Sequence, residues 1–263
     1  MEVIALQVLY TVPIIAFTYL LAFGLEKWLC LLSAEYNHIE AVYNHNKISF
    51  LNTQGKWNTN TVIGVFSVGP LIAALLGGIT AKFSGLYIRT TGIAKIFFFW
   101  LNIMLFFRML GGLISGAWHR EGVYHFLSWL GSGPVFATFA AVIGLILIGS
   151  TSYFMAPLAI ATSLSVRQVD KPVRRAAFMI LTNGISLVGA IFLLKLFFYP
   201  YGIAAYEATI LWSIFLFLIP VAYWQQKLKR FKISRSSPLS PANWGLVLFF
   251  FAIMIAIRYI WIL

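Results

Sequence analysis

The stretch FFFWLNIMLFFRMLGGLISG, residues 97–116, contains a single charged side chain, Arg108, among apolar and small residues and one asparagine. About 20 mainly apolar residues in a helix cross the roughly 30 Å hydrocarbon core of a membrane. The whole chain is 61% hydrophobic and 10% charged, whereas an ordinary soluble domain has about 25% charged residues. This stretch is therefore predicted to be a transmembrane helix.

Apolar blocks of similar length recur in both directions from this stretch, and most are bounded by Pro, Gly, Trp or charged residues. We therefore predict an all-α polytopic membrane protein with about seven transmembrane helices, forming one bundle over residues 1–263. The first helix is expected to be retained, because no basic segment precedes it and no small-residue cleavage signal follows it. The predicted spans are 3–24, 61–81, 93–116, 134–156, 174–199, 204–225 and 243–262.

Basic residues are distributed unevenly over the predicted loops: twelve on one side of the membrane and four on the other. The positive-inside rule then places the N-terminus in the cytoplasm and the C-terminus outside, and we expect the cytoplasmic (inner) membrane of a bacterium. This asymmetry accounts for the formal net charge of +12 without a nucleic-acid partner. The lipid bilayer is the expected partner of the chain.

The basic cytoplasmic linker 227–242 is rich in Ser and Pro. It either contacts anionic lipid headgroups, at about 1 kcal/mol per basic residue, or is an ordinary cytoplasmic loop. Its basic residues are Lys227, Lys229, Arg230, Lys232 and Arg235.

The external loop 25–60 is predicted to carry a small β-hairpin between helices 1 and 2. Residues 39–43 and 47–51 favour strands, and Asn44-His45-Asn46 between them tolerates a turn. The second external loop, WHREGVYHFLSWLGSG at residues 118–133, is predicted to form a short interfacial helix anchored by its aromatic rings.

All four histidines fall in these two external loops, together with Glu121, so a shared metal site is one hypothesis. The spacing argues against it, because residues seven apart lie about 10.5 Å apart along a helix and on opposite faces of a strand. No cofactor is predicted, and Cys30, the single cysteine, excludes an intrachain disulfide. The candidate ligands are His38, His45, His119, His125 and Glu121.

Glu207 is the only acidic residue inside a predicted span, and either Arg108 or Arg258 lies at a depth from which it can meet Glu207. A carboxylate in lipid is costly, so it marks a structural ion pair or a functional site. Asn102 and Asn183 also lie within spans, where amides commonly join helices or line a polar path.

One family resemblance follows from the order of features: a first span, an external hairpin, SVGPLIAALLGG at residues 67–78, and then the stretch 97–116. This order resembles the intramembrane zinc metallopeptidases of the site-2-protease class over about residues 5–150. That family carries two zinc-binding histidines and a glutamate on its first core helix, and PIIAFTYLLAFG at residues 13–24 has none of them. The resemblance therefore implies a degenerate relative that does not hydrolyse peptides by the zinc mechanism.

Three functional hypotheses follow. The leading one is a non-catalytic scaffold or subunit of a larger membrane complex. The alternative is a small transporter that uses Glu207, Arg108 and Asn102. The third is a metal-dependent membrane enzyme that uses the external histidines.

Overall fold

The computed structural model describes residues 2–44, 47–51, 55–83, 93–131, 133–228 and 241–262. Within them, six helical segments are long and apolar enough to cross a membrane. These are α1 (Glu2–Tyr36), α2 (Thr59–Lys82), α4 (Ile93–His119), α6 (Pro134–Ala161), the segment Pro172–Phe197, and α9 (Ala205–Lys227). The segment Pro172–Phe197 comprises α7 (Pro172–Ala177), a π-helical stretch (Phe178–Asn183) and α8 (Gly184–Phe197).

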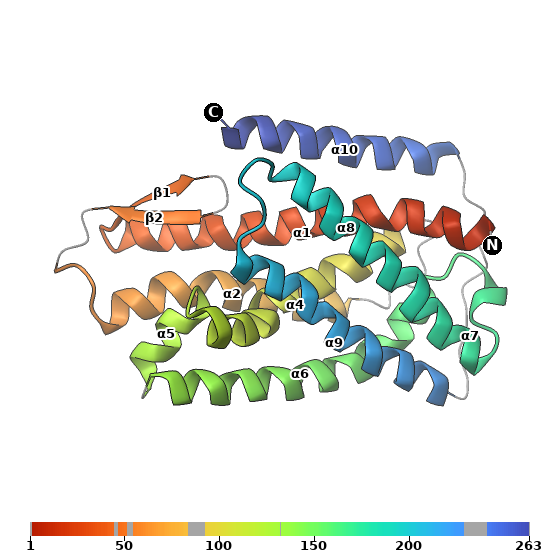
Figure 1. The fold of residues 1–263 in the computed structure, drawn as a ribbon, viewed down its shortest axis with the longest axis horizontal. Coiled ribbons are helices and arrows are strands. Elements are labelled where there is room, and N and C mark those ends of the chain that lie inside the picture. Colours follow the sequence, from red (N-terminus) through yellow and green to blue (C-terminus); the bar gives the residue numbers. More distant parts are fainter. Residues whose placement is uncertain are drawn as a thin grey trace.

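The long helices run side by side along the long axis of the molecule, and the two chain termini lie at opposite ends (Figure 1). The seventh predicted span coincides with α10 (Pro241–Ile262), which packs beside α1. The hairpin and the short helix α5 (Val123–Leu130) lie at one end of the bundle, and α7 lies at the other. This arrangement confirms the predicted class, a polytopic helical membrane protein.

The hairpin also forms as predicted, with β1 (Glu40–Asn44) antiparallel to β2 (Lys47–Leu51). Ile39, just before β1, is buried with Cys30 of α1 and Val65 of α2, which fixes the hairpin onto the bundle. Two residues of the predicted turn, His45 and Asn46, lie outside the described residues.

The first helix differs from the prediction, which ended the span at residue 24. Instead α1 continues to Tyr36, so Glu26 and Lys27 lie on the helix and not in the external loop. Charged residues usually mark the end of a span because an unpaired charge is costly in lipid. Here both side chains have partners of opposite charge, which removes that cost.

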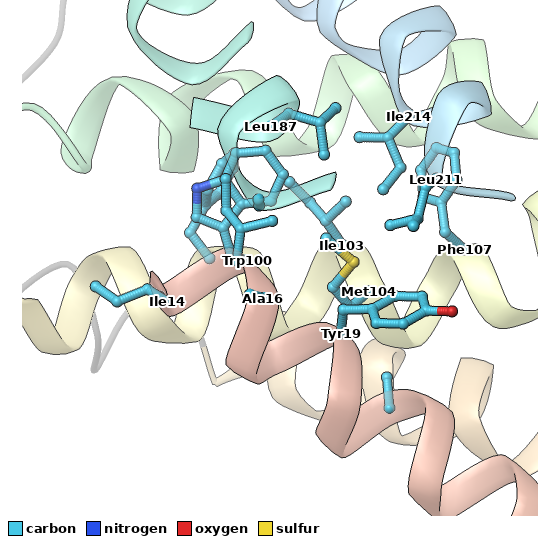
Figure 2. Close-up of a cluster of buried hydrophobic side chains, with 14 of the residues drawn as sticks. Ile14, Ala16, Tyr19, Trp100, Ile103, Met104, Phe107, Leu187, Leu211 and Ile214 are labelled. Carbon is cyan, nitrogen blue, oxygen red and sulfur yellow. The ribbon is translucent and has the colours of Figure 1, made fainter. Parts of the chain in front are cut away.

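The core on the side away from the hairpin is apolar and closely packed. Figure 2 shows Ile14 and Ala16 of α1 against Trp100 and Ile103 of α4. Leu187 of α8 and Leu211 and Ile214 of α9 complete the cluster. Tyr19 lies at its edge, with its hydroxyl oxygen pointing away from Trp100 (Figure 2).

Gly69 permits a close approach of α2 to α1. A Cβ atom at this position would lie 2.7 Å from the Glu26 carbonyl oxygen and 2.8 Å from Glu26 Cγ. Both distances are too short for any real contact, so a larger residue must push the two helices apart.

We expect Gly69→Ala to lower the free energy of unfolding by about 1–3 kcal/mol, because overpacking at a helix contact displaces Glu26. The matched control is Gly78→Ala in the same helix, where a Cβ atom would meet nothing within 4 Å. Thermal unfolding in mild detergent compares the two variants. Equal melting temperatures for both would contradict the predicted close approach.

Candidate functional site

Four charged side chains from three helices meet inside the bundle, a group that we call the charge cluster: Glu26 and Lys27 of α1, Arg108 of α4 and Glu207 of α9. Arg108, in the middle third of α4, is 1% exposed, and Glu207 is 2% exposed. Buried charges of this kind are expensive unless they are paired and hydrogen-bonded. The cluster meets that condition, because its two carboxylates balance its two cations.

Arg108 is the centre of the charge cluster. Its Nη1 donates to Glu207 Oε2 at 2.7 Å and its Nη2 to Glu207 Oε1 at 3.0 Å, a bidentate pair. Its Nε donates to Glu26 Oε2, so the guanidinium joins α1 and α9 through α4. Lys27 Nζ lies 3.2 Å from Glu207 Oε1 and 3.4 Å from Glu26 Oε1.

Two aromatic residues of α1 complete the surroundings of these charges. The Tyr19 hydroxyl donates to Glu207 Oε2 at 3.0 Å. The Phe23 ring centroid lies 5.5 Å from Arg108 Cζ and 5.2 Å from Lys27 Nζ, within the range of cation–π attraction. Tyr19, Phe23 and Glu26 are spaced by four and three residues, so they share one helix face.

Glu207 reaches the charge cluster because α9 begins deep in the bundle. Figure 1 shows α9 starting farther from the hairpin end than α5 does. Glu207 lies in the first turn of α9, where the helix dipole favours a negative charge. Gly111 and Gly112 of α4 admit this close packing, since Cβ atoms there would lie 2.8 Å from Ser213 Oγ and 3.1 Å from the Tyr206 hydroxyl.

A cavity of about 560 Å³ lies between the charge cluster and the hairpin. Its floor includes Glu26, Lys27 and Glu207, and Lys47 of β2 and Glu121 also line it. The remaining lining is mostly apolar and aromatic and comes from the hairpin, α2, α5 and the start of α9: Ile48, Phe50, Trp57, Val62, Val65, Phe66, Pro70, Val123, Trp129, Ala204 and Tyr206.

His125 of α5 also lines this cavity, with its ring centroid 4.6 Å from that of Phe66. Burial lowers the pKa of His125 from its usual value, and the nearby Glu121 opposes the shift. The neutral imidazole is therefore the favoured form at neutral pH.

The sequence-predicted intramembrane residues divide into two groups. Arg108 meets Glu207, whereas Arg258 does not: its guanidinium donates to the carbonyl oxygens of Leu196 at 3.4 Å and Tyr199 at 3.2 Å. Of the two arginines that were candidate partners, Arg108 is therefore the one that meets Glu207, whereas Arg258 finds its acceptors at the end of α8. Arg258 ties α10 to α8 instead.

The two asparagines contact other side chains away from the charge cluster. Asn102 of α4 accepts a hydrogen bond from Thr80 of α2, and so joins two helices. Asn183 Nδ2 lies 3.5 Å from Met179 Sδ within the π-helical stretch. Neither residue lines the cavity.

The candidate metal ligands that the structure describes have separate partners. The His38 carbonyl accepts from Lys56 Nζ at 2.9 Å, His119 Nε2 lies 2.7 Å from Thr209 Oγ1, and His125 faces Phe66. His45 lies outside the described residues. Among the residues with described positions, no group of three or more His, Cys, Asp or Glu side chains is placed to hold a metal ion.

Lys227, one of the five residues predicted to contact lipid headgroups, is the last residue of α9. Its Nζ lies 5.4 Å from the Tyr223 ring centroid. The other four lie outside the described residues: Lys229, Arg230, Lys232 and Arg235.

We expect Glu207→Gln and Arg108→Gln each to lower the free energy of unfolding by about 3–5 kcal/mol, because each leaves a buried charge without its partner. The double variant restores a neutral cluster and should cost less than the sum of the two single changes. Glu35→Gln, at an exposed position of α1, is the control. Denaturant unfolding in mild detergent measures all four, and strictly additive losses would refute the coupling.

Comparison with known proteins adds no relative to this picture. No family model matches the chain, and no curated protein or solved structure matches it either. The charge cluster and the cavity above it are therefore the features that indicate a function.

Proposed function

We propose that this integral membrane protein binds a small solute within the bundle, in the cavity at the hairpin end, as a receptor or carrier for that solute. The observation that carries the proposal is that the charge cluster forms the floor of a cavity. This favours the second sequence-based hypothesis, in which Glu207 and Arg108 serve a transport protein.

Two features separate this proposal from a purely structural ion pair. A purely structural pair needs no open space beside it, yet the Lys27 side chain is 18% exposed and lines the cavity. The cavity volume also lies within the roughly 300–1,000 Å³ range of small-molecule sites. A cavity of this size above charged groups provides both space and specific contacts for a ligand.

The described residues of the other half of the bundle are closely packed next to the charge cluster. The apolar cluster around Trp100 and Ile103 fills the space beyond the charge cluster (Figure 2). The arrangement of helices in the structure therefore supports binding of a solute from the hairpin end. A carrier would need a second arrangement of α1, α4, α8 and α9.

The hairpin end is proposed to face outward from a cytoplasmic membrane. Support comes from the uneven distribution of the described basic residues: Lys27, Lys47, Lys56 and Arg120 lie toward the hairpin end, whereas seven lie at the opposite end, and the positive-inside rule assigns the more basic end to the cytoplasm. These seven are Lys82, Lys95, Arg167, Lys171, Arg174, Arg175 and Lys227.

Cys30 lines the cavity and is the only cysteine of the chain, so it reports on access from outside. We expect a membrane-impermeant methanethiolsulfonate reagent to modify Cys30 in intact cells. In inside-out vesicles the same reagent should act much more slowly. Mass spectrometry of the purified protein measures the modified fraction over time.

A matched control moves the thiol along the same helix. In Cys30→Ala/Ala16→Cys the cysteine lies in the apolar core, where Ala16 is fully buried, and modification from either side should be at least about tenfold slower (Figure 2). Modification of Cys30 no faster than of this control would refute an accessible cavity. Faster modification from the inside would reverse the proposed orientation.

A second candidate function, a subunit of a larger membrane complex, is supported by the hairpin. Among the described residues β1 and β2 pair only with each other, so each strand keeps an outer edge on which a partner strand can add. Ala41 forms a non-hydrogen-bonded pair with Phe50, so its backbone N–H faces the outer edge of β1, and replacing Ala41 with Pro blocks such addition there. A partner that copurifies in mild detergent with the native chain and not with Ala41→Pro would support this function, and a lone monomer in both preparations would count against it.

Kinship with the site-2-protease class remains a proposal. The segment 13–24 lies on α1 and contains no histidine or glutamate that could bind zinc as that family does. If the kinship is real, the cavity serves binding and not zinc-dependent peptide hydrolysis.

A further inference from the structure

Resting on the proposed function, we propose that the cavity takes a zwitterionic head on an apolar body. The head carries an ammonium group close to an anionic group, and the body faces the aromatic wall. Three properties of the cavity favour such a ligand: its charge balance, its unused hydrogen-bonding capacity and its apolar lining.

The charges around the cavity sum to zero. In the charge cluster the carboxylates of Glu26 and Glu207 balance Lys27 and Arg108. Nearer the hairpin, Lys47 and Glu121 line the cavity with opposite charges. A ligand with a net charge would place an uncompensated charge in this low-dielectric space, whereas a zwitterion adds none.

The unused hydrogen-bonding capacity lies on two consecutive residues. Each carboxylate oxygen of Glu207 already has two partners. Arg108 and Tyr19 contact Oε2, and Arg108 and Lys27 contact Oε1. Among the residues with described positions, Glu26 Oε1 has only the long 3.4 Å contact with Lys27. Lys27 Nζ contacts two oxygens among the described residues and carries three N–H donors.

Glu26 and Lys27 therefore present an acceptor and a donor side by side at the cavity floor. An ammonium group fits against Glu26 Oε1, and an anionic group fits against Lys27 Nζ. The two groups must lie close together on the ligand, because the two atoms that receive them are 3.4 Å apart.

The wall above this floor suits an apolar body. The ring centroids of Phe50 and Trp57 lie 5.3 Å apart, and those of Trp57 and Phe66 lie 5.9 Å apart, which makes a continuous aromatic surface. Two sources share this ligand chemistry: a free apolar amino acid or short peptide, and the headgroup of a zwitterionic phospholipid.

The experiment uses the full-length protein in nanodiscs and measures how fast the uncharged reagent methyl methanethiolsulfonate modifies Cys30. Three probes share a phenyl body: L-phenylalanine is zwitterionic, 3-phenylpropionate is anionic and 2-phenylethylamine is cationic. A separate arm compares phosphatidylglycerol nanodiscs with and without phosphatidylethanolamine. The dipeptide phenylalanyl-phenylalanine is added to the soluble probes to test a longer zwitterion.

We expect the rate of Cys30 modification to fall about tenfold when a free zwitterion is present at about ten times its Kd. If the ligand is a lipid head, phosphatidylethanolamine in the nanodisc should lower the rate by a similar factor. The anion and the cation should leave the rate nearly unchanged. Slowing by the free zwitterions identifies a soluble ligand, and slowing by phosphatidylethanolamine alone identifies a lipid head.

Two variants control the result. Glu26→Gln/Lys27→Gln keeps the cluster neutral and retains the Arg108–Glu207 pair, so it should fold and lose the protection. In Cys30→Ala/Ser49→Cys the thiol lies on the exposed strand β2, where no probe should change the rate.

Equal protection by the anion or the cation would overturn the proposal, as would unchanged rates in both arms. Either result leaves the proposed function standing while Cys30 remains accessible from the hairpin end. Failure of Cys30 to react at all would refute the proposed function itself.

Discussion

The balance of two carboxylates against two cations inside the bundle is the constraint on which the rest of the structure depends. Arg108 sits in the middle of a long apolar helix, where an unpaired guanidinium costs several kcal/mol. Its bonds to Glu26 and Glu207 bring α1 and α9 to α4 at defined depths. These contacts hold three helices that are far apart in the sequence at matching depths in the bundle.

Other features of the fold follow from the depths at which the charge cluster holds these helices. α1 continues past Glu26 and Lys27 as a helix, which carries Cys30 and Ala34 far enough to support the hairpin. α9 begins with Glu207 in its first turn, so the chain before it enters the bundle interior. Irregular backbone at such depth is tolerated where it is buried or lines a cavity, and Ala204 lies at the cavity wall.

The sequence predicted the elements well because each one depends on local composition. Apolar block length identifies the spans, and the strand-favouring runs around residues 44–46 identify the hairpin. Arg108 and Glu207 stood out because a charge within an apolar block is rare. Glu26 was missed because a charge at the end of a block normally marks the end of a span.

The spacing of Tyr19, Phe23 and Glu26 was the available signal that Glu26 shares a helix face with other cluster residues. The sequence left both Arg108 and Arg258 as candidate partners of Glu207, because depth alone does not say which helices are neighbours. The cavity could not be predicted, since its walls come from the hairpin, α2, α5 and α9. Only the packing of these elements creates the space between them.

The long sequence separation within the charge cluster has a consequence for biosynthesis. α1 and α4 leave the ribosome before Glu207 is made, so the newly inserted helices carry a cluster that lacks one of its two carboxylates. Helices of membrane proteins insert first and associate afterwards. Arrival of α9 therefore completes the neutral cluster, and a chain truncated before α9 keeps one more cation than carboxylate among these residues.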